Sequence, residues 1–553
     1  SCRGTESETL EGCEDDEGNV VSNSAIVAQC MELTMTMIEN SKIAKSCVEP
    51  RLRAITSMAV AASLTTDEQL ETWEEDVNQF VADEEDDYQS VRATTEVFLD
   101  SLSGKFPKTF FAALAEVVAE QFEKSFAQQN ANDENWWRAR EAALFAVGGL
   151  SEQLVEHAHD FKQKNMSAPF DCDAFLNEII RSELNPGAPT FSNTNAFLKG
   201  RALWAASRLA AASSANGANA ILDASVNALN DPNAQFPVKI GACRSLIAFV
   251  PMVKTEHQKN NTKAKKKNGD KNQASLSEED EMKVQKLLSR LGDVYQGLGQ
   301  LLTDATEDAL VLILEALLEV VRADGDAALR WLSLLAPAII RIWAENVRDP
   351  LIGATARDVI QALANQPKCN AELTQLVVPE LAKVFSTPNE QPEMLVEASL
   401  DILACLLKPC VDEIVARNAF AATFVNLSLL AKTSDDVGIV QNALDAMKAF
   451  LRAAKGEGIL SWGSDPNAVS RAYLDACATS LNPNCEEGAS LFVAPLLGQM
   501  IRRLPSIVGP MIPEICDAVC ARLQTSTRPM LISALLCIFA RLAHVDANAL
   551  VSL

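Results

Sequence analysis

An alanine followed by apolar or small residues four and eight positions later recurs every 42 to 47 residues through the second half of the chain. The six anchors are Ala309, Ala356, Ala398, Ala443, Ala489 and Ala534. Offsets of four and eight place one stripe on an α-helix, because each nearly completes a whole number of turns. A period in the forties is typical of α-solenoids of the HEAT or armadillo type. The chain is therefore predicted to be an all-α superhelix of HEAT repeats, with negligible strand content.

The length of 553 residues corresponds to roughly a dozen such helical pairs. HEAT repeats are predicted at 24–253, with an acidic loop at 71–87, and at 282–553. Residues 1–23 are expected to form an acidic, disordered loop. Residues 254–281 are expected to form a disordered insert, Lys-rich and then acidic, because Ala242 and Ala309 stand farther apart than one period.

The charge balance is strongly acidic, with 74 Asp and Glu against 48 Lys and Arg and a formal net charge of −26. Such a surface repels nucleic acid and anionic membranes and attracts basic partners. Solubility of a large protein is the other explanation. The clustering of the acids favours binding, so we expect basic protein partners and no direct nucleic-acid binding.

The 14 cysteines follow no regular spacing, which predicts reduced thiols in a cytosolic or nuclear compartment. No stretch of 18 uninterrupted apolar residues and no signal-peptide pattern is present, so neither secretion nor membrane insertion is expected. The absence of an initial Met suggests a fragment of a longer protein. A monomer is expected.

The sequence carries no pattern for catalysis. A phosphate-cradling loop, a dinucleotide-binding glycine motif and a nucleophile elbow are all absent. Only four His residues are present, and Cys516 and Cys520 lack a second pair at zinc spacing. We therefore predict no enzyme activity, no catalytic residues, no metal site and no cofactor.

An acidic segment at 71–87 is the first functional candidate. It contains nine acids and no base: Glu71, Glu74, Glu75, Asp76, Asp83, Glu84, Glu85, Asp86 and Asp87. So many like charges are costly unless a basic partner is near. Trp73 and Phe80 are interleaved, which suggests that the aromatic rings dock on the solenoid and hold the acids outward. A solvated loop between repeats is the alternative, and a calcium site is less favoured.

The Lys-rich insert has three interpretations: a spacer, a localisation or nucleic-acid patch, and an internal mimic that competes with basic cargo. The spacer is the default, since no aromatic residue interleaves the lysines. Trp136 and Trp137 open a strongly patterned helix, where paired tryptophans are more often packing residues than a ligand platform.

Three stretches carry a family resemblance: Thr72 to Val81 with the acids that follow, Trp136 to Ala142, and Gly200 to Arg208. They resemble the importin-9 branch of the β-karyopherin family of nuclear transport receptors. The family-signature residues are Trp73, Phe80, Trp136, Trp137, Arg201, Trp204 and Arg208. The match places the chain in the middle and later repeats of a longer family member.

The resemblance implies nuclear import of basic cargo, above all core histones, with Ran-GTP modulating release and FG-repeat nucleoporins allowing passage. It also implies a chaperone-like shielding of histones, and shuttling between cytoplasm and nucleus through the nuclear pore. The candidate Ran or basic-cargo contact comprises Glu74, Glu75, Asp76, Asp83, Glu84, Glu85, Asp86 and Asp87. A HEAT scaffold unrelated to Ran, such as a phosphatase regulatory subunit, is the alternative.

Overall fold

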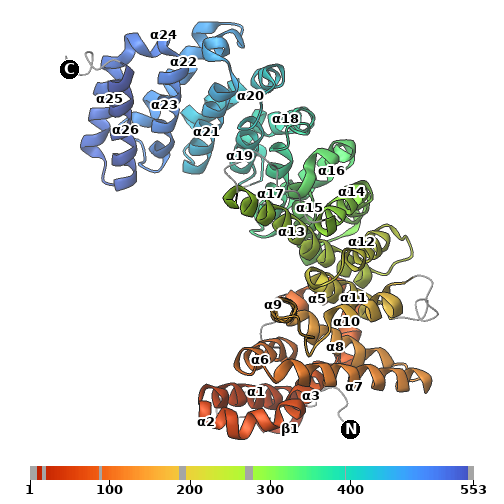
Figure 1. Ribbon diagram of the computed structural model, residues 1–553. Coiled ribbons are helices and arrows are strands. Elements are labelled where there is room, and N and C mark those ends of the chain that lie inside the picture. The colour runs from red at the N-terminus through yellow and green to blue at the C-terminus, as the bar shows by residue number, and fades with distance from the viewer. Residues whose placement is uncertain are drawn as a thin grey trace. The chain divides into compact units, whose positions relative to one another are not determined.

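The computed structural model describes residues 9–14, 20–85, 90–185, 195–267, 278–392 and 394–545. The chain divides into two compact units, Ser1–Ala323 and Asp324–Leu553. Each unit is built of stacked antiparallel helices (Figure 1). The all-α prediction is confirmed, and the described residues add one small sheet.

The first unit begins with that sheet and continues with helices. Its elements are β1 (Thr9–Glu14), β2 (Val20–Ser22), α1 (Asn23–Glu39), α2 (Ser41–Ile43), α3 (Leu52–Ala62), α4 (Asp67–Glu75), α5 (Val77–Glu85), α6 (Val91–Lys105), α7 (Phe110–Asn130), α8 (Trp136–Gly149), α9 (Ser151–Gln163), α10 (Cys172–Ile179), α11 (Ala196–Leu209), α12 (Ala215–Asn230), α13 (Phe236–Lys267), α14 (Glu278–Asp304) and α15 (Glu307–Asp324). Helices α6, α8, α11 and α13 contact one another in succession and form one row.

The second unit contains α16 (Leu332–Glu345), α17 (Ile352–Ala364), α18 (Asn370–Ser386), α19 (Leu395–Leu407), α20 (Glu413–Thr433), α21 (Val437–Ala453), α22 (Pro466–Leu481), α23 (Val493–Arg503), α24 (Pro505–Val508), α25 (Ile512–Thr525) and α26 (Pro529–Val545). Two rows run through it. Helices α16, α18, α20, α22 and α25 contact in sequence, as do α17, α19, α21, α23 and α26.

The alanine anchors mark one helix of each repeat. Five of them lie in α15, α17, α19, α21 and α26, and Ala489 lies in the short 3₁₀ turn that leads into α23. All six residues at the fourth offset are buried, from Ile313 to Ile538, as are all six at the eighth, from Leu317 to Leu542. The repeated stripe is therefore buried in the core of the unit to which each helix belongs.

Three expectations about irregular segments are corrected. Within the expected N-terminal loop, β1 and β2 pair as an antiparallel hairpin. Within the expected insert, α13 continues to Lys267 and α14 begins at Glu278, while residues 268–277 lie outside the described residues. Lys, Gln, Glu and Ala are good helix formers, and a helix already nucleated in the core extends through them at little cost.

The third correction concerns the acidic segment, which is helical rather than a loop. Thr66 accepts a hydrogen bond from the Gln69 backbone N–H, and the Gln69 side chain accepts one from the Thr66 N–H, which starts α4. Asp76 is extended and its Oδ1 accepts from the Asn78 N–H, which ends α4 and starts α5. Local capping thus builds two short helices from residues whose charge suggested a loop.

Three helices among the described residues have the length and mean hydropathy of a membrane span, a broader criterion than an uninterrupted apolar run. The windows are Phe236–Val253, Ala327–Glu345 and Glu413–Thr433. Between 44% and 50% of each window is buried inside the protein. A bent pair, Ala489–Arg503 with Pro505–Thr525, also meets the criterion when counted as one span.

Helices α11 and α13 cross with their backbones in contact. A Cβ built on Gly241 would overlap the carbonyl oxygen and Cα of Gly200, and one built on Gly200 would overlap the carbonyl oxygen of Pro237. Neither obstacle is a flexible side chain that could swing away. The close approach therefore requires glycine at both positions.

We predict that Gly241→Ala separates the two helices and destabilises the first unit by about 1–3 kcal/mol. Urea unfolding followed by circular dichroism measures the effect. Gly104→Ala is the matched control, because Gly104 is exposed in α6 and nothing lies within 4 Å of its added Cβ. The control should leave stability unchanged or raise it by up to about 1 kcal/mol. An equal change in the free energy of unfolding in the two variants would contradict the close approach of α11 and α13.

Candidate functional site

The acidic strap, residues 67–85 comprising α4 and α5, is held to the first unit by a cluster of aromatic rings. Trp73 and Phe80 are 3% and 5% exposed. Their ring centroids lie 5.2 Å apart, and each lies within 5.4 Å of the Phe197 ring. Phe197 in turn stacks on Trp137 at 6.2 Å. These contacts join the strap to the first turns of α8 and α11.

Polar contacts extend the strap across further repeats. Asp67 pairs with Arg138 of α8. The Arg244 guanidinium of α13 lies 5.5 Å from the centroid of the Phe80 ring. The Asn78 Nδ2 donates to the Thr306 Oγ1 at 3.0 Å, immediately before α15 begins. The strap therefore bridges helices of several successive repeats, and its partners lie up to 228 residues away in sequence.

The acids of the strap divide into outward and inward groups. Glu71, Glu74, Glu75 and Asp76 are exposed. Asp83 instead accepts a hydrogen bond from the Trp73 indole N–H at 2.8 Å and another from Gln79. Asp83 is thus an anchoring residue of the strap, whereas the other four present carboxylates to solvent.

The remaining predicted contact acids are less fully described. Glu84 and Glu85 belong to the last turn of α5, and Asp86 and Asp87 lie outside the described residues. The exposed acids of α4, and Asp76 between α4 and α5, are consequently the part of the predicted contact that the structure describes fully.

A buried ionic network lies behind the strap. Glu141 of α8 is 2% exposed and pairs with Arg92 of α6 and Arg201 of α11, each at 2.8 Å. Arg92 also donates to the Ser63 carbonyl oxygen at 2.6 Å, just before the strap begins. One carboxylate therefore pairs with two buried guanidinium groups and joins three helices.

A second buried ion pair involves Arg140, which lies in α8 next to Glu141. Arg140 and Glu183 are both fully buried and lie 2.5 Å apart. The Arg140 guanidinium also faces the rings of Phe126 at 4.4 Å and Trp136 at 5.2 Å. The stretch from Trp136 to Glu141 thus uses its large side chains in packing and ion pairing between helices.

The signature residues of α11 belong to the same layer. Arg201 and Arg208 lie over the Trp204 ring, at 4.7 Å and 5.2 Å from its centroid. Trp204 stacks on Phe145 of α8 at 6.3 Å. Arg208 donates to the Ser151 Oγ at 3.0 Å, at the start of α9. These residues are placed to hold α11 against α8 and α9.

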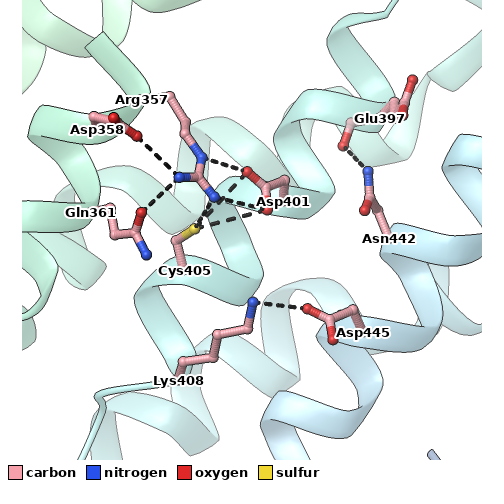
Figure 2. A network of polar contacts seen from close by, with 9 residues as sticks. All are labelled: Arg357, Asp358, Gln361, Glu397, Asp401, Cys405, Lys408, Asn442 and Asp445. Carbon is pink, nitrogen blue, oxygen red and sulfur yellow. Dashed lines mark hydrogen bonds and ion pairs between the residues drawn. The ribbon is translucent and has the colours of Figure 1, made fainter. Parts of the chain in front are cut away.

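Figure 2 shows a polar network along one row of the second unit. Arg357 of α17 pairs with Asp401 of α19 at 2.8 Å and donates to Gln361 at 2.6 Å. Lys408 of α19 pairs with Asp445 of α21 at 2.9 Å. The network therefore links three consecutive helices of the row.

The network carries a surplus of acid. Burial, and then the neighbouring Asp436 and Asp401, raise the pKa of Glu397 above its ordinary value. Burial acts in the same sense on Asp445, but hydrogen bonds from Lys448 and Lys408 outweigh it and hold the pKa of Asp445 below its ordinary value. Asp445 is thus fully balanced by cations, whereas Glu397 lies among other carboxylates and favours a basic neighbour.

Sequence reasoning missed this network and the partners of the strap. Arg357, Asp401 and Asp445 fall at different offsets from their alanine anchors, so the repeat itself gives no signal for them. Phe197 could have been noticed, because it stands just before the signature stretch at Gly200. Among the described residues, no three His, Cys, Asp or Glu side chains are grouped to hold a metal ion.

Comparison with known proteins finds similarity to importins in each case. A family model described as importin-9 central HEAT repeats matches residues 48–289. Importin-9 of Drosophila melanogaster is 23% identical over 497 residues, which cover 88% of this chain and 44% of the relative. Importin subunit beta-5 of Schizosaccharomyces pombe is 21% identical over 267 residues, which cover 48% and 26%. The chain spans less than half the length of either relative.

Solved structures of the karyopherin Kap121p also match. The complex with the extreme C-terminus of the protein phosphatase Cdc14p has a TM-score of 0.41 at 12% identity and covers 95% of this chain and 52% of that one. The complex with Pho4p has a TM-score of 0.40 at 12% identity and covers 94% and 52%. Likenesses at these TM-scores support no inference about what this chain binds.

We predict that Glu141→Gln destabilises the first unit by about 3–5 kcal/mol, because it removes the buried negative charge that pairs with both Arg92 and Arg201. The midpoint of the first transition in urea unfolding reports the loss. Glu120→Gln is the control, since the Glu120 pair with Arg53 is about half exposed on both sides. That exposed pair should contribute about 1 kcal/mol or less. A small effect of Glu141→Gln would mean that the network does not support the fold.

Proposed function

Because this chain is an importin-9-like member of the karyopherin-β family, we propose that it forms part of a nuclear import receptor for basic protein cargo. The resemblance to the family implies cargo loading in the cytosol, passage through the nuclear pore and modulation by Ran-GTP. Cytoplasm and nucleus are then its compartments. We propose that it acts as a monomer and that core histones are its cargo.

The observation that carries the cargo proposal is the outward row of acids on a firmly anchored strap. Glu74, Glu75 and Asp76 are exposed, while Trp73 and Phe80 beneath them are buried. Like charges held close together on rigid helices gain more from a basic partner than the same charges on a loop, since less ordering entropy is lost on binding. The net charge of −26 adds a long-range attraction for strongly basic proteins.

A shielding role follows from the same chemistry. A strongly basic cargo binds DNA through its Lys and Arg side chains, and those groups are covered when they pair with the acids of the receptor. We therefore propose that the chain protects histones from nonspecific contacts as well as carrying them.

For nucleoporins, we propose the groove between α16 and α18 as a site for the Phe of an FG repeat. Its cavity has a volume of about 650 Å³ and is lined by Ile340, Trp343, Leu376 and Leu381 among others. In this family, Phe side chains of FG repeats usually insert between neighbouring outer helices. A smaller cavity of about 380 Å³ between α7 and α10, lined by Phe122, Phe126 and Phe175, has the same character.

We predict that Glu74→Gln, Glu75→Gln and Asp76→Asn together weaken binding to a core histone dimer, more at low salt than at high salt, because screening already removes much of the attraction at high salt. A pull-down with this chain and with a longer parent, each with and without Ran-GTP, measures it. The control is Glu514→Gln with Asp517→Asn, two exposed acids of α25.

The outcomes separate the parts of the proposal. Equal affinity of the triple variant and the unchanged chain at both salt concentrations would remove the strap from the cargo contact. Binding of histones by neither protein would contradict the proposed cargo.

We also predict that Leu376→Ser lowers affinity for an FG-repeat peptide about tenfold, as expected when a buried apolar contact of about 1.4 kcal/mol is lost. Leu376 is 41% exposed and lines the α16–α18 groove. Leu334→Ser is the matched control, because Leu334 is 39% exposed on α16 and does not line the groove. Isothermal titration measures both, and equal loss in the two variants would contradict the assignment of this groove.

A further inference from the structure

A second acidic feature lies in the second unit, away from the strap in sequence. A cavity of about 390 Å³ opens between the α20–α21 turn and the end of α22. We call it the turn pocket, and its lining includes Lys432, Asp435, Asp436, Ser480 and Glu486.

The electrostatics of the turn pocket favour a cation. Helices α20 and α22 end at Thr433 and Leu481, so the negative ends of two helix dipoles meet there. Asp435, Asp436 and Glu486 are all exposed at its rim. The one basic lining residue, Lys432, pairs with Asp475 of α22 at 2.9 Å. The N-terminus of α21 opposes this field in part, and Asp436 already caps it by accepting from the Gly438 N–H at 2.8 Å.

An unsatisfied hydroxyl provides an independent sign of a ligand. Ser480 lines the pocket and is 1% exposed. Its Oγ has no hydrogen-bond partner among the described residues. Buried hydroxyls in helices usually donate to the carbonyl four residues earlier, as Thr423 does to Ala419 at 2.8 Å. Ser480 does not, so its Oγ lone pairs are available to a hydrogen-bond donor that enters the pocket.

We propose that the turn pocket receives a lysine or arginine side chain from a basic polypeptide partner. The cationic head meets the carboxylates of Asp435 and Glu486 and the Ser480 hydroxyl, while the apolar stem lies along Val437 and Val440. This inference rests on the proposed function, because it gives basic cargo a second contact in the second unit. The turn pocket would hold a single side chain, whereas the strap presents several exposed carboxylates.

A charged side chain fits the pocket better than a metal ion. No group of three ligating side chains among the described residues is arranged for a metal. The cavity is large enough for one long cationic side chain with water around its head. The ammonium or guanidinium donors match carboxylate and hydroxyl acceptors that come from three different segments.

The test uses the full chain and a fluorescein-labelled decapeptide in which Lys alternates with Gly. Fluorescence polarisation measures its affinity for the unchanged chain, for Asp435→Asn with Glu486→Gln, and for Ser480→Ala. We expect the double variant to weaken binding about fivefold and Ser480→Ala about twofold. The same peptide with every Lys acetylated should bind no better than the double variant binds the charged one.

Controls separate the pocket from general charge and from folding. Glu514→Gln with Asp517→Asn removes the same charge from α25 in the same unit and should leave the affinity unchanged. Ser480→Ala removes an unsatisfied buried hydroxyl, so its melting temperature should be equal to or above that of the unchanged chain. Loss of affinity in a variant of undiminished stability assigns the effect to the pocket.

Carbodiimide coupling locates the contact, because it joins a peptide Lys to a carboxylate that it touches. We expect coupling at Asp435, Asp436 or Glu486 by mass spectrometry. Unchanged affinity in the pocket variants, together with coupling only at the strap, would overturn the proposal and leave the proposed function intact. Failure of the full chain to bind either histones or the peptide would overturn both.

Discussion

The Glu141 carboxylate is the contact on which the first unit depends most. Buried between Arg92 and Arg201, it joins α6, α8 and α11 and pairs with two guanidinium groups that have been withdrawn from water. A single acid in such a position is costly to remove and leaves little freedom in how the three helices are spaced. The aromatic cluster around Phe197 is built on the same helices, so the placement of the acidic strap follows from this ionic layer.

The strap and the turn pocket lie in different units, but both present exposed carboxylates to a partner. In each, exposed carboxylates stand on helices or in the short turns that join them. Glu74 and Glu75 stand on a helix whose Trp73 is buried, whereas Asp435 lies in the turn between α20 and α21 and Glu486 in the loop after α22. A partner with basic side chains relieves the repulsion in both places without reordering the backbone.

The sequence predicted the architecture because a solenoid is specified locally. Each repeat buries the same stripe against the next, so Ile313 and Ile360 reveal their burial by spacing alone. The docking of Trp73 and Phe80 could also be predicted, because large aromatic rings in an otherwise charged segment are stabilised by burial against the rest of the protein. The helices of the strap could not, because capping by Thr66 and Asp76 outweighs a composition that resembles a loop. The continuation of α13 to Lys267 was missed because a polar composition also resembles a loop, although a helix already nucleated in the core extends through such residues.

The sequence alone therefore determined the helical period, the buried stripe and the surplus of negative charge, all of which are local or additive properties. Only the tertiary structure decided which charges meet. Asn78 contacts Thr306, Arg140 contacts Glu183 and Arg357 contacts Asp401 because stacked repeats bring distant helices to a common face. The unsatisfied hydroxyl of Ser480 likewise exists only once α22 is packed. Which residues pair across repeats depends on how whole helices pack against one another, and the sequence pattern within one repeat does not specify that packing.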